Sequence, residues 1–599
     1  MISNFWIHPA LLLIIGACAL PLFRGVLRVP FLLLVPTLAF GAVLSMTPGT
    51  YGIFPFADWQ LLFGRVDGLS LIFAYIMSLM CIIATLYGLH VKDPYQHMAA
   101  WFYVAGSLGV IFAGDFLVLF LFWEVMAFAS VFLIWFRGRD QSPATGYRYL
   151  LVHTAGGLAL LAGIILHYHT SGSLSFNLLT TTELTAATWL ILIGFLLNAA
   201  AFPLHSWLPD AYGEASVVGA VFMCAFTTKT AVYALARGFA GLEILVYLGV
   251  IMAVVGVIYA ILENDARRLL AYSIISQVGY MVAAVGIGTT LAINGASAHA
   301  FAHILYKGLL FMGVGSVLHM TGKSKFTELG GLYKKMPRTL LFTLVGCGSI
   351  AAVPLFSGFV SKSMIIAAGF EAHLYGATFI LLAASAGTFL YNGLKMPYLI
   401  FFGESRCSKE TWERAGDPPW HMQLAMGIGA FFCLLVGIYY PYLYAMLPFP
   451  QAVAGYQPYN AYQLAESLQL LAFTALAFYF MRNLLRPKAT ITLDLDWFYR
   501  LGGQLFLLLA DGAFTRLNRW GQESLAQGLP RRLNHFFADG PARLCLLLVK
   551  PVWQLTGAKI DGPEGAEQRL LSTFRRSLFT IGSSAICTVA VLLALLLLG

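Results

Sequence analysis

The sequence has 599 residues, of which 59% are hydrophobic and only 11% are charged, and its mean hydropathy is +0.78. Soluble domains carry about 25% charged residues, so this composition excludes a single soluble core. It favours membrane helices, each of which needs about 20 mostly apolar residues to cross the bilayer. The net charge of +9 then belongs to loops at the membrane surface, and no nucleic acid is expected as a partner.

The eight cysteines are scattered along the chain, and no two of them form a CxxC pair. They predict neither a metal site nor a disulfide framework. The sequence also has no glycine-rich phosphate loop between a strand and a helix. We therefore expect no metal, nucleotide or redox cofactor on this chain, which argues against a self-contained redox enzyme.

Sixteen apolar stretches are long enough to be membrane spans. The first begins near Pro9 and is followed by no small-residue cleavage pattern, so we interpret it as a retained span. The predicted spans are roughly 9–24, 29–46, 68–91, 100–114, 116–136, 148–168, 187–209, 216–236, 241–262, 270–288, 293–320, 338–360, 373–402, 421–444, 461–481 and 575–598.

The loops between these spans differ in charge. If successive loops lie on alternate sides of the membrane, the two sides can be compared up to the tail that follows the fifteenth span. The loops on one side then hold only Arg65 and Arg237 as basic residues, whereas the loops on the other side hold sixteen. Such an asymmetry places the basic loops in the cytoplasm and both termini on the opposite side of a bacterial inner membrane. The basic loops contain Arg24, Arg28, Lys92, Arg137, Arg139, Arg148, Arg267, Arg268, Lys323, Lys325, Lys334, Lys335, Arg338, Arg406, Lys409 and Arg414.

Two spans carry an internal proline in similar surroundings. Residues 201–204 read AFPL inside the seventh span, and residues 352–355 read AVPL inside the twelfth. Proline removes a helical hydrogen bond, and interrupted helices at matching places in two repeats indicate a transport site. Kinked membrane helices are also common without any such role.

Residues 483–574 are basic and amphipathic, which is typical of helices that lie in the membrane interface. Breaks are expected at Gly502-Gly503, at 528–530 and at Gly540-Pro541. This segment is either a surface anchor or a brace along a partner subunit. A last span, 575–598, follows it.

Several ionisable residues lie inside the predicted spans, where a charge costs on the order of 2.5–3.5 kcal/mol. Near the inner end of the thirteenth span, Lys395 could extend its ammonium to the surface. The other such residues are Glu124, Lys229, His299, His303 and Lys307, and Lys362 follows the proline break of the twelfth span.

His299, His303 and Lys307 are spaced i, i+4, i+8, which places them along one helix face. Histidine titrates near neutral pH, and burial brings a lysine toward that range. A row of such groups joined by water can pass protons. A metal pair is the alternative for the two histidines, but no carboxylate or cysteine accompanies them at ligand spacing. Glu124 could instead form a static buried ion pair with a lysine.

Six segments together resemble the antiporter-like subunits shared by respiratory complex I and the Mrp cation/proton antiporters. The resemblance covers residues 68 to 400. Its motifs are FWExM at Glu124, FPLHSWLPDAY at 202–212, TTKTAVYALAR at 227–237, NDARRLLAYSIISQVGY at 264–280, HAFAHILYKGLLF at 299–311 and PLFSGFVSK at 354–362.

The resemblance implies an all-α polytopic membrane fold of about 14–16 helices, with two inverted five-helix repeats and broken helices 7 and 12. It also implies roles for the buried residues. Glu124 would modulate the lysine of the first repeat. Lys229 would link the two half-channels, which are the proton paths through the first and the second repeat. His299 and His303 would carry protons, Lys362 would be the broken-helix lysine of the second half, and Lys307 would occupy a recurrent position.

Two positions depart from the family pattern. The seventh helix of the family carries a lysine before its proline, but here that position is Asn198, whose amide cannot hold a proton at neutral pH. Either Lys229 pairs with Glu124 instead, or the first half-channel conducts poorly. The second departure is residues 214–219, where Glu214 could add a carboxylate near the cytoplasmic mouth.

The resemblance favours a proton-translocating component of a larger membrane complex, of the D type found in Mrp Na+/H+ antiporters. A proton-pumping component of a complex I-like or hydrogenase-type complex is the first alternative, and a structural subunit with an impaired half-channel is the second. The expected domains are N-terminal helices 1–99, a first repeat 100–236, a second repeat 241–402, peripheral helices 421–482, the amphipathic segment 483–574 and a C-terminal span 575–599.

Overall fold

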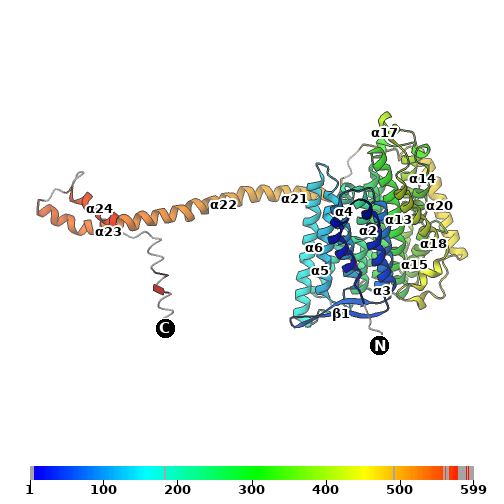
Figure 1. The fold of residues 1–599 in the computed structure, drawn as a ribbon, viewed down its shortest axis with the longest axis horizontal. Coiled ribbons are helices and arrows are strands. Elements are labelled where there is room, and N and C mark those ends of the chain that lie inside the picture. The colour runs from blue at the N-terminus through cyan, green and yellow to red at the C-terminus, as the bar shows by residue number, and fades with distance from the viewer. Residues whose placement is uncertain are drawn as a thin grey trace. The chain divides into compact units, whose positions relative to one another are not determined.

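The fold is described by a computed structural model, which covers residues 6–180, 184–489, 493–557, 560, 565–577, 588–589 and 591–592 (Figure 1). It forms two compact units, Met1–Asp494 and Leu495–Gly599, here called the membrane unit and the tail unit. Among the described residues, eleven helices are long and apolar enough to cross a membrane. The prediction of an all-α polytopic membrane protein is confirmed.

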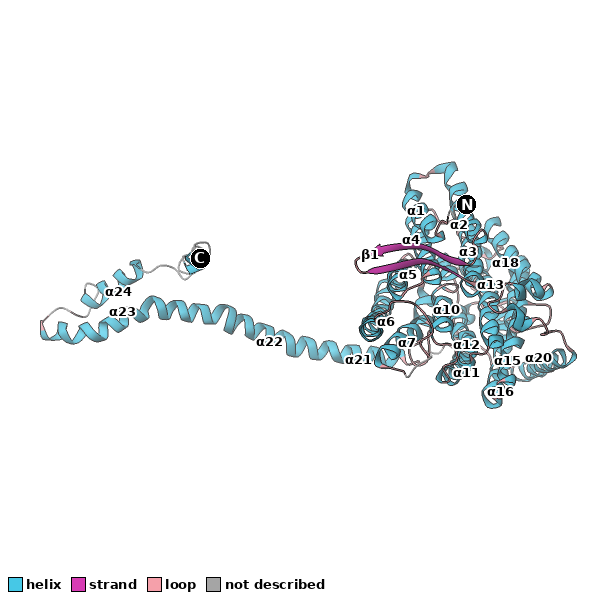
Figure 2. Ribbon diagram, turned by 90° about the horizontal axis from the view of Figure 1, so that it is seen from below, coloured by secondary structure: helices cyan, strands magenta, loops and turns pink. Residues whose placement is uncertain are grey.

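The first half of the membrane unit begins with helices α1 and α2 and continues through a hairpin of two strands, and its remaining named elements in the described residues are helices (Figures 1 and 2). Its elements are α1 (Pro9–Ala19), α2 (Arg28–Leu44), β1 (Gly49–Phe56), β2 (Trp59–Val66), α3 (Gly68–Tyr87), α4 (Pro94–Phe112), α5 (Phe116–Trp135), α6 (Ser142–Ser171), α7 (Ala186–Asn198), α8 (Trp207–Glu214), α9 (Val217–Met223) and α10 (Thr227–Gly238).

The second half of the membrane unit is helical throughout the part that the structure describes. Its helices are α11 (Ile244–Leu262), α12 (Ala266–Ile287), α13 (Thr290–Thr321), α14 (Pro337–Ile350), α15 (Ser357–Glu371), α16 (Tyr375–Thr388), α17 (Lys409–Arg414), α18 (Trp420–Ile438), α19 (Tyr440–Ala445) and α20 (Ala461–Met481). After α16 the helix continues as wider π-helical turns, Phe389–Lys395 and Tyr398–Phe402.

The hairpin of β1 and β2 is antiparallel, pairs Gly49 with Val66 and Phe56 with Trp59, and was not predicted from the sequence. It lies across one end of the helix bundle (Figures 1 and 2). The carboxylate of Asp115, which caps α5, accepts a hydrogen bond from the Leu62 amide at 2.6 Å. This bond fixes the hairpin to the bundle.

The first residues after the hairpin join α3 to α10. Asp67 caps α3 and accepts two hydrogen bonds from the Arg237 guanidinium, each at 2.8 Å. Burial alone would raise the pKa of the Asp67 carboxyl, but the bonds from Arg237 and Ser70 hold it below its usual value. Arg65, 3.5 Å from the same carboxylate, completes a cluster in which Asp67 offsets one of the two positive charges expected on the outer side.

Two helices are interrupted where the internal prolines predicted it. Helix α7 ends at Asn198 and α8 begins at Trp207, while α14 ends at Ile350 and α15 begins at Ser357. Ala200 and Ala352 have φ of 55° and 57°, which a helix cannot contain, and each follows its helix end by two residues. The Phe202–Pro203 bond is cis. The inverted relation of the two halves stays a prediction.

Helix α13 forms the centre of the membrane unit. All of its 18-residue apolar window is buried, because α3, α9, α12, α14, α15 and α18 pack around it. It begins at the cap residue Thr289 and ends at Gly322, whose φ of +74° suits only glycine without strain. A helix that is enclosed on every side offers its polar residues protein neighbours instead of lipid.

The tail unit contains α21 (Asp496–Leu509), α22 (Thr515–Trp520), α23 (Leu529–Leu555) and α24 (Ala566–Ser577). The expected breaks in this segment are wrong. Gly502-Gly503 lies inside α21 and Gly540-Pro541 lies inside α23, while π-helical turns at Ala510–Phe514 and Gly521–Gly528 connect α21, α22 and α23 into one helical run. Glycine inside a helix costs only about 1 kcal/mol, and proline is tolerated in a first turn, where Pro530 lies.

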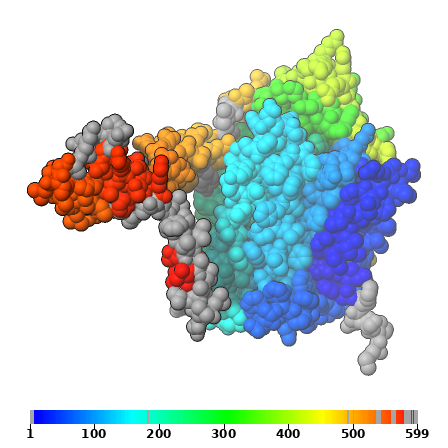
Figure 3. Space-filling view, turned by 60° about the vertical axis from the view of Figure 1, so that its left-hand side comes forward, coloured from blue at the N-terminus to red at the C-terminus, as the bar shows by residue number. Residues whose placement is uncertain are grey.

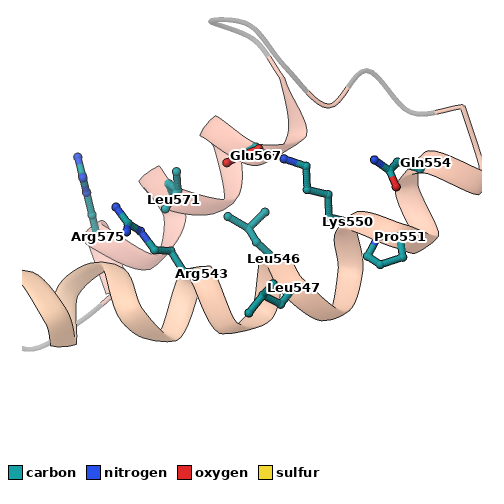
Figure 4. A pocket seen from close by; sticks show the side chains of 9 residues that line it. All are labelled: Arg543, Leu546, Leu547, Lys550, Pro551, Gln554, Glu567, Leu571 and Arg575. Carbon is teal, nitrogen blue, oxygen red and sulfur yellow. Dashed lines mark hydrogen bonds and ion pairs between the residues drawn. The ribbon is translucent and has the colours of Figure 1, made fainter.

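Helix α24 folds back onto α23, and Lys550 pairs with Glu567 at 3.1 Å. Between the two helices lies a cavity of about 630 Å3 whose wall combines leucines with Arg543, Lys550 and Arg575 (Figure 4). Such a mixture fits the predicted interfacial character of the segment. Most of the predicted last span, 575–598, lies outside the described residues.

Candidate functional site

Three helices of the membrane unit bring ionisable side chains into its interior. Lys229 lies on α10, His299, His303 and Lys307 lie on α13, and Lys362 lies on α15. The first four are 0% exposed and Lys362 is 3% exposed. None of them forms an ion pair with an acidic side chain in the part of the chain that the structure describes. Together with the broken helices, these residues form the candidate site.

Lys229 lies one turn into α10, directly after the non-helical residues that separate α10 from α9. Its ammonium donates to the backbone carbonyl of Cys224 at 2.7 Å and to the Thr228 hydroxyl at 3.0 Å. The Cys224 carbonyl lies in the gap between the two helices and is free to accept this bond. The lysine is held by neutral oxygens only.

The two histidines of α13 have different surroundings. His299 contacts the Ser361 hydroxyl through Nδ1 at 3.0 Å and the Tyr306 hydroxyl through Nε2 at 3.4 Å. Neither nitrogen of His303 has a hydrogen-bond partner among the described residues, although its ring packs on Tyr306 at 5.1 Å. A buried imidazole in this state leaves donor and acceptor positions for water or a transferred proton.

Lys307, two turns along α13 from His299, donates to the carbonyl of Leu270 on α12 at 3.2 Å. Lys362 donates to the carbonyl of Ile350 at 3.1 Å and to the Ser385 hydroxyl at 3.3 Å. Ile350 is the last residue of α14, so its carbonyl is one of those that a helix end leaves without an internal partner. The break between α14 and α15 thus provides the acceptor for Lys362.

These residues lie close enough to influence one another electrostatically. His303 is within the field of Lys229, Lys307, His299 and Lys362, and His299 is within the field of Lys229 and Lys362. The ring centroids of His299 and His303 are 6.3 Å apart. The structure therefore brings Lys229, the two histidines, Lys307 and Lys362 into one buried group.

A cavity of about 260 Å3 opens beside Lys362 between α15, α16 and α20. Its wall includes the carboxylates Glu371 and Glu466, the amide Gln463 and the hydroxyls of Ser363 and Ser467. The volume exceeds that of several water molecules. Water can therefore reach one of the buried lysines from outside the group.

Glu124 does not join the buried group. Its side chain lies against Gly157 of α6 and lines an apolar surface cavity with Phe128 and Phe132. That cavity lies on the α5 flank of the membrane unit; Figure 3 shows a face on which α5 and α6 (cyan) are exposed. No ion pair joins Glu124 to Lys229 in the described structure, so the pairing considered from the sequence is wrong.

Asn198 is fully buried at the end of α7, and neither amide atom has a hydrogen-bond partner among the described residues. Its amide faces His153 of α6, whose ring packs on Tyr149 at 4.1 Å and on Trp207 at 4.5 Å. His153 was not singled out from the sequence. It gives the first half one ionisable group beside the asparagine.

Two secondary candidates have clear surroundings. Lys395 is 4% exposed and donates to the carbonyls of Ile261 and Glu263 at 2.5 and 2.9 Å. It binds the end of α11, so the expectation that its ammonium extends to the surface is wrong. Glu214 lines a charged surface cavity of about 650 Å3 with Arg139, Asp265 and Lys323.

Sequence reasoning also missed polar residues that carry no charge or lie far apart in the chain. Tyr306 and Ser361 contact His299, and Gln277 lies 3.5 Å from Tyr306. His205, in the break after α7, pairs with Asp494 at 3.2 Å. Placing an uncharged polar residue inside a membrane span costs too little free energy for the residue to stand out in the sequence. A contact between positions 205 and 494 leaves no pattern in a single sequence.

The protein-family comparison matches the NADH:quinone oxidoreductase/Mrp antiporter transmembrane family over residues 113–390. The D-type subunit of the Na+/H+ antiporter from Alkalihalophilus pseudofirmus is 30% identical over 380 residues, which cover 59% of this chain and 76% of that protein. The chain belongs to the NADH:quinone oxidoreductase/Mrp antiporter family. It is an integral, multi-pass membrane protein.

Two further relatives are similar at the same level. Hydrogenase-4 component B of Escherichia coli is 29% identical, with 64% of this chain and 63% of that protein covered. The longer A-type subunit of the same A. pseudofirmus antiporter is 33% identical, with 54% and 46% covered. The chain thus spans about half the length of that longer relative.

Solved structures of this family have the same fold. A chain of an archaeal membrane-bound sulfane sulfur reductase is 28% identical with a TM-score of 0.68, and the match covers 81% of this chain and 85% of that one. A chain of the Mrp complex from Dietzia also has a TM-score of 0.68 at 22% identity, covering 78% and 98%. The second likeness supports the fold alone.

Proposed function

We propose that this chain is a proton-translocating subunit of a multisubunit membrane complex, of the Mrp type that exchanges a cation such as Na+ for protons. The observation that carries the proposal is the buried group of Lys229, His299, His303 and Lys362, which lies inside the membrane unit without acidic partners among the described residues. Charges are rarely buried in a membrane without a function. A purely structural lysine would be expected to pair with a carboxylate.

The contacts of the group suit proton transfer. Each lysine binds carbonyl and hydroxyl oxygens, which accept a hydrogen bond from an ammonium and also from a neutral amine. Losing a proton therefore breaks no ion pair. His303, without a hydrogen-bond partner in the described structure, can receive a proton from the direction of Lys229 and release it toward His299.

The second half of the membrane unit then provides the exit route for the proton. His299 contacts Ser361, the neighbour of Lys362, and Lys362 lines the cavity that holds Glu371 and Glu466. A proton that reaches Lys362 can leave through water in this cavity. Lys307 adjusts the field around this route. Lys395 binds the end of α11, and Glu214 lines the charged cavity at the surface.

On the charge asymmetry of the loops, we also propose a bacterial inner membrane with the basic loops in the cytoplasm. Two further features support partner subunits. Relatives of this chain are named as subunits or components of larger assemblies. Helices α5 and α6 also expose large apolar side chains such as Phe128, Leu158 and Ile165, which suit lipid or a neighbouring membrane protein.

A redox complex is the second candidate, favoured by one observation. The chain is 28% identical to a chain of a respiratory sulfur-reducing complex and 29% identical to a hydrogenase component. In such an assembly the same buried group would move protons, while electron transfer elsewhere would drive them. The third candidate is a structural subunit whose first half-channel conducts protons poorly, as Asn198 suggests.

The test is proton flux in vesicles that contain the assembled complex. We expect Lys362→Ala and Lys229→Ala each to lower the flux roughly tenfold or more, because a positioned proton carrier contributes at least that much. The readout is a pH-sensitive dye inside the vesicles after a Na+ pulse. Lys409→Ala, at an exposed position at the start of α17, is the control and should keep full flux.

Full flux in both buried-lysine variants would refute a translocating role. A wild-type complex that ignores the Na+ pulse but moves protons when a quinone or hydrogen donor is supplied would place the chain in a redox complex. Flux in neither condition from a fully assembled complex would favour the structural subunit.

A further inference from the structure

A buried carboxylate from the end of the membrane unit lies at the break of the seventh span. Asp494 is the last residue of that unit, and its two oxygens have different partners. One lies 3.2 Å from Nε2 of His205, and the other accepts a hydrogen bond from the Tyr272 hydroxyl at 2.7 Å. The side chains of His205 and Asp494 are only 0% and 2% exposed.

The partners of Asp494 come from two elements of the candidate site. His205 lies between α7 and α8, two residues after Pro203, and Tyr272 lies on α12. Tyr272 stacks on Tyr259 of α11, with ring centroids 5.1 Å apart. The aspartate thus connects a loop that follows the last helix of the membrane unit to the break of the seventh span.

Other charged groups surround this contact. Arg268 on α12 pairs with Glu263 at 3.0 Å, and both lie within the field of Tyr272. Arg268 is in turn within the field of Asp210. Arg268 and Glu263 carry opposite charges, so their effects on the field at Tyr272 oppose each other.

The chemistry of the pair permits proton exchange. The contact between His205 and Asp494 is short, but neither imidazole nitrogen meets hydrogen-bond geometry with a described residue. When His205 is protonated, its Nε2–H bond can break as an O–H bond forms on Asp494, which turns an ion pair into two neutral groups. Burial of a charged pair is costly, which lowers the free-energy advantage of the ion pair over the two neutral groups.

We propose that His205 and Asp494 are the proton-exchanging pair of the first half-channel, with Asp494 as a further proton-carrying residue. Asn198, on the other side of the same break, cannot hold a proton. The pair provides a titratable group within the same interrupted helix. This inference rests on the proposed function, since it assigns a residue to the same proton pathway.

The alternative is that Asp494 only anchors the chain to the bundle. Asp494→Asn separates the two roles, because the asparagine oxygen can still accept the bond from Tyr272 while the side chain can no longer carry a proton. We expect the variant to assemble normally and to lose roughly tenfold or more of the proton flux. Asp494→Glu, which restores the carboxylate, should recover a large part of it.

The matched control is Asp496→Asn, two residues further along, where the aspartate is half-buried and pairs with Arg500 on its own helix. It should keep wild-type flux. The double variant Asp494→Asn/His205→Gln should lose no more flux than the more impaired single variant, because the two residues act as one unit. Flux is measured in vesicles of the complete complex, and assembly is measured by native electrophoresis.

Wild-type flux in Asp494→Asn, in a preparation where Lys362→Ala abolishes flux, would overturn this inference and leave the proposed function standing. Wild-type flux in both would mean that the proposed function itself has failed. If Asp494→Asn does not assemble, His205→Gln decides, since it keeps the bond between Asp494 and Tyr272. Full flux in an assembled His205→Gln complex would also overturn the pair.

Discussion

At the scale of single residues, three histidines meet at one end of the bundle. His90 lies in the loop after α3, and its ring is 4.7 Å from that of His319 and 5.4 Å from that of His421. Burial, with the neighbouring imidazoles, lowers the pKa of His90 from 6.5 to about 4. The folded protein therefore keeps His90 neutral at pH values where an unfolded chain would protonate it.

This difference predicts an acid-sensitive fold. Between about pH 6.5 and 4 the unfolded chain binds one proton more at His90 than the folded one, so stability falls as the pH falls through this window. His90→Gln should make the melting temperature in detergent less dependent on pH between 7 and 5. His169→Gln, at an exposed position near the end of α6, should follow the wild type; equal slopes for all three proteins would contradict the assignment.

The sequence alone revealed those ionisable residues whose burial in an apolar span costs free energy. Lys229, His299, His303 and Lys362 stand out because a charge within an apolar span is expensive, and the structure does bring them together. Their partners did not stand out. The carbonyls of Cys224 and Ile350 have no side-chain signature, and the contact of Lys395 with the end of α11 depends on how two helices pack.

At the scale of elements, α11 and α12 pack closely through glycines spaced seven residues apart. Gly249 and Gly256 on α11 face Gly279 and Ser276 on α12. A Cβ atom on Gly279 would lie 2.5 Å from the carbonyl oxygen of Gly249 and 2.7 Å from the amide nitrogen of Ala253. Small residues are a common way for membrane helices to approach, and here the approach fixes Tyr259 against Tyr272.

Gly279→Ala should therefore separate the two helices. The added methyl group meets backbone atoms that cannot rotate away, so we expect a loss of about 1–3 kcal/mol in stability, seen as a lower melting temperature of the purified protein. Gly376→Ala on α16, where nothing lies within 4 Å of the added group, should leave the melting temperature unchanged or slightly higher. An unchanged melting temperature for Gly279→Ala would mean that the two helices can move apart without a loss of stability.

Elements differ in how far a sequence predicts them. The breaks in the seventh and twelfth spans follow from Pro203 and Pro354, because proline acts locally. The hairpin of β1 and β2 was missed because β1 is exposed along almost its whole length and does not alternate between buried and exposed residues. The helical run of the tail unit was misjudged because glycine and proline were expected to break the helix, whereas Gly502-Gly503 and Gly540-Pro541 lie inside α21 and α23.

At the scale of the whole molecule, the described apolar core belongs to the membrane unit. Its cluster of buried apolar side chains runs from Ala10 to Val453 and includes none from the tail unit. Composition alone could predict a bundle of membrane helices, because a single soluble core cannot bury so many apolar residues. The boundary after Asp494 depends on which residues pack together, and that information is not local.

The division into units predicts the effect of removing the tail. A chain that ends after Asp494 keeps the whole core and the contacts of Asp494 with His205 and Tyr272, so its melting temperature in detergent should equal that of the full chain. Its assembly with neighbouring membrane subunits should fall, because a basic amphipathic segment suits a membrane interface or a partner. A chain that ends after residue 489 lacks Asp494 as well and should also lose the proton flux that remains in any assembled complex. A large drop in melting temperature for the first truncation would show that the tail unit stabilises the core, and equal flux from both truncations would separate Asp494 from the proton pathway.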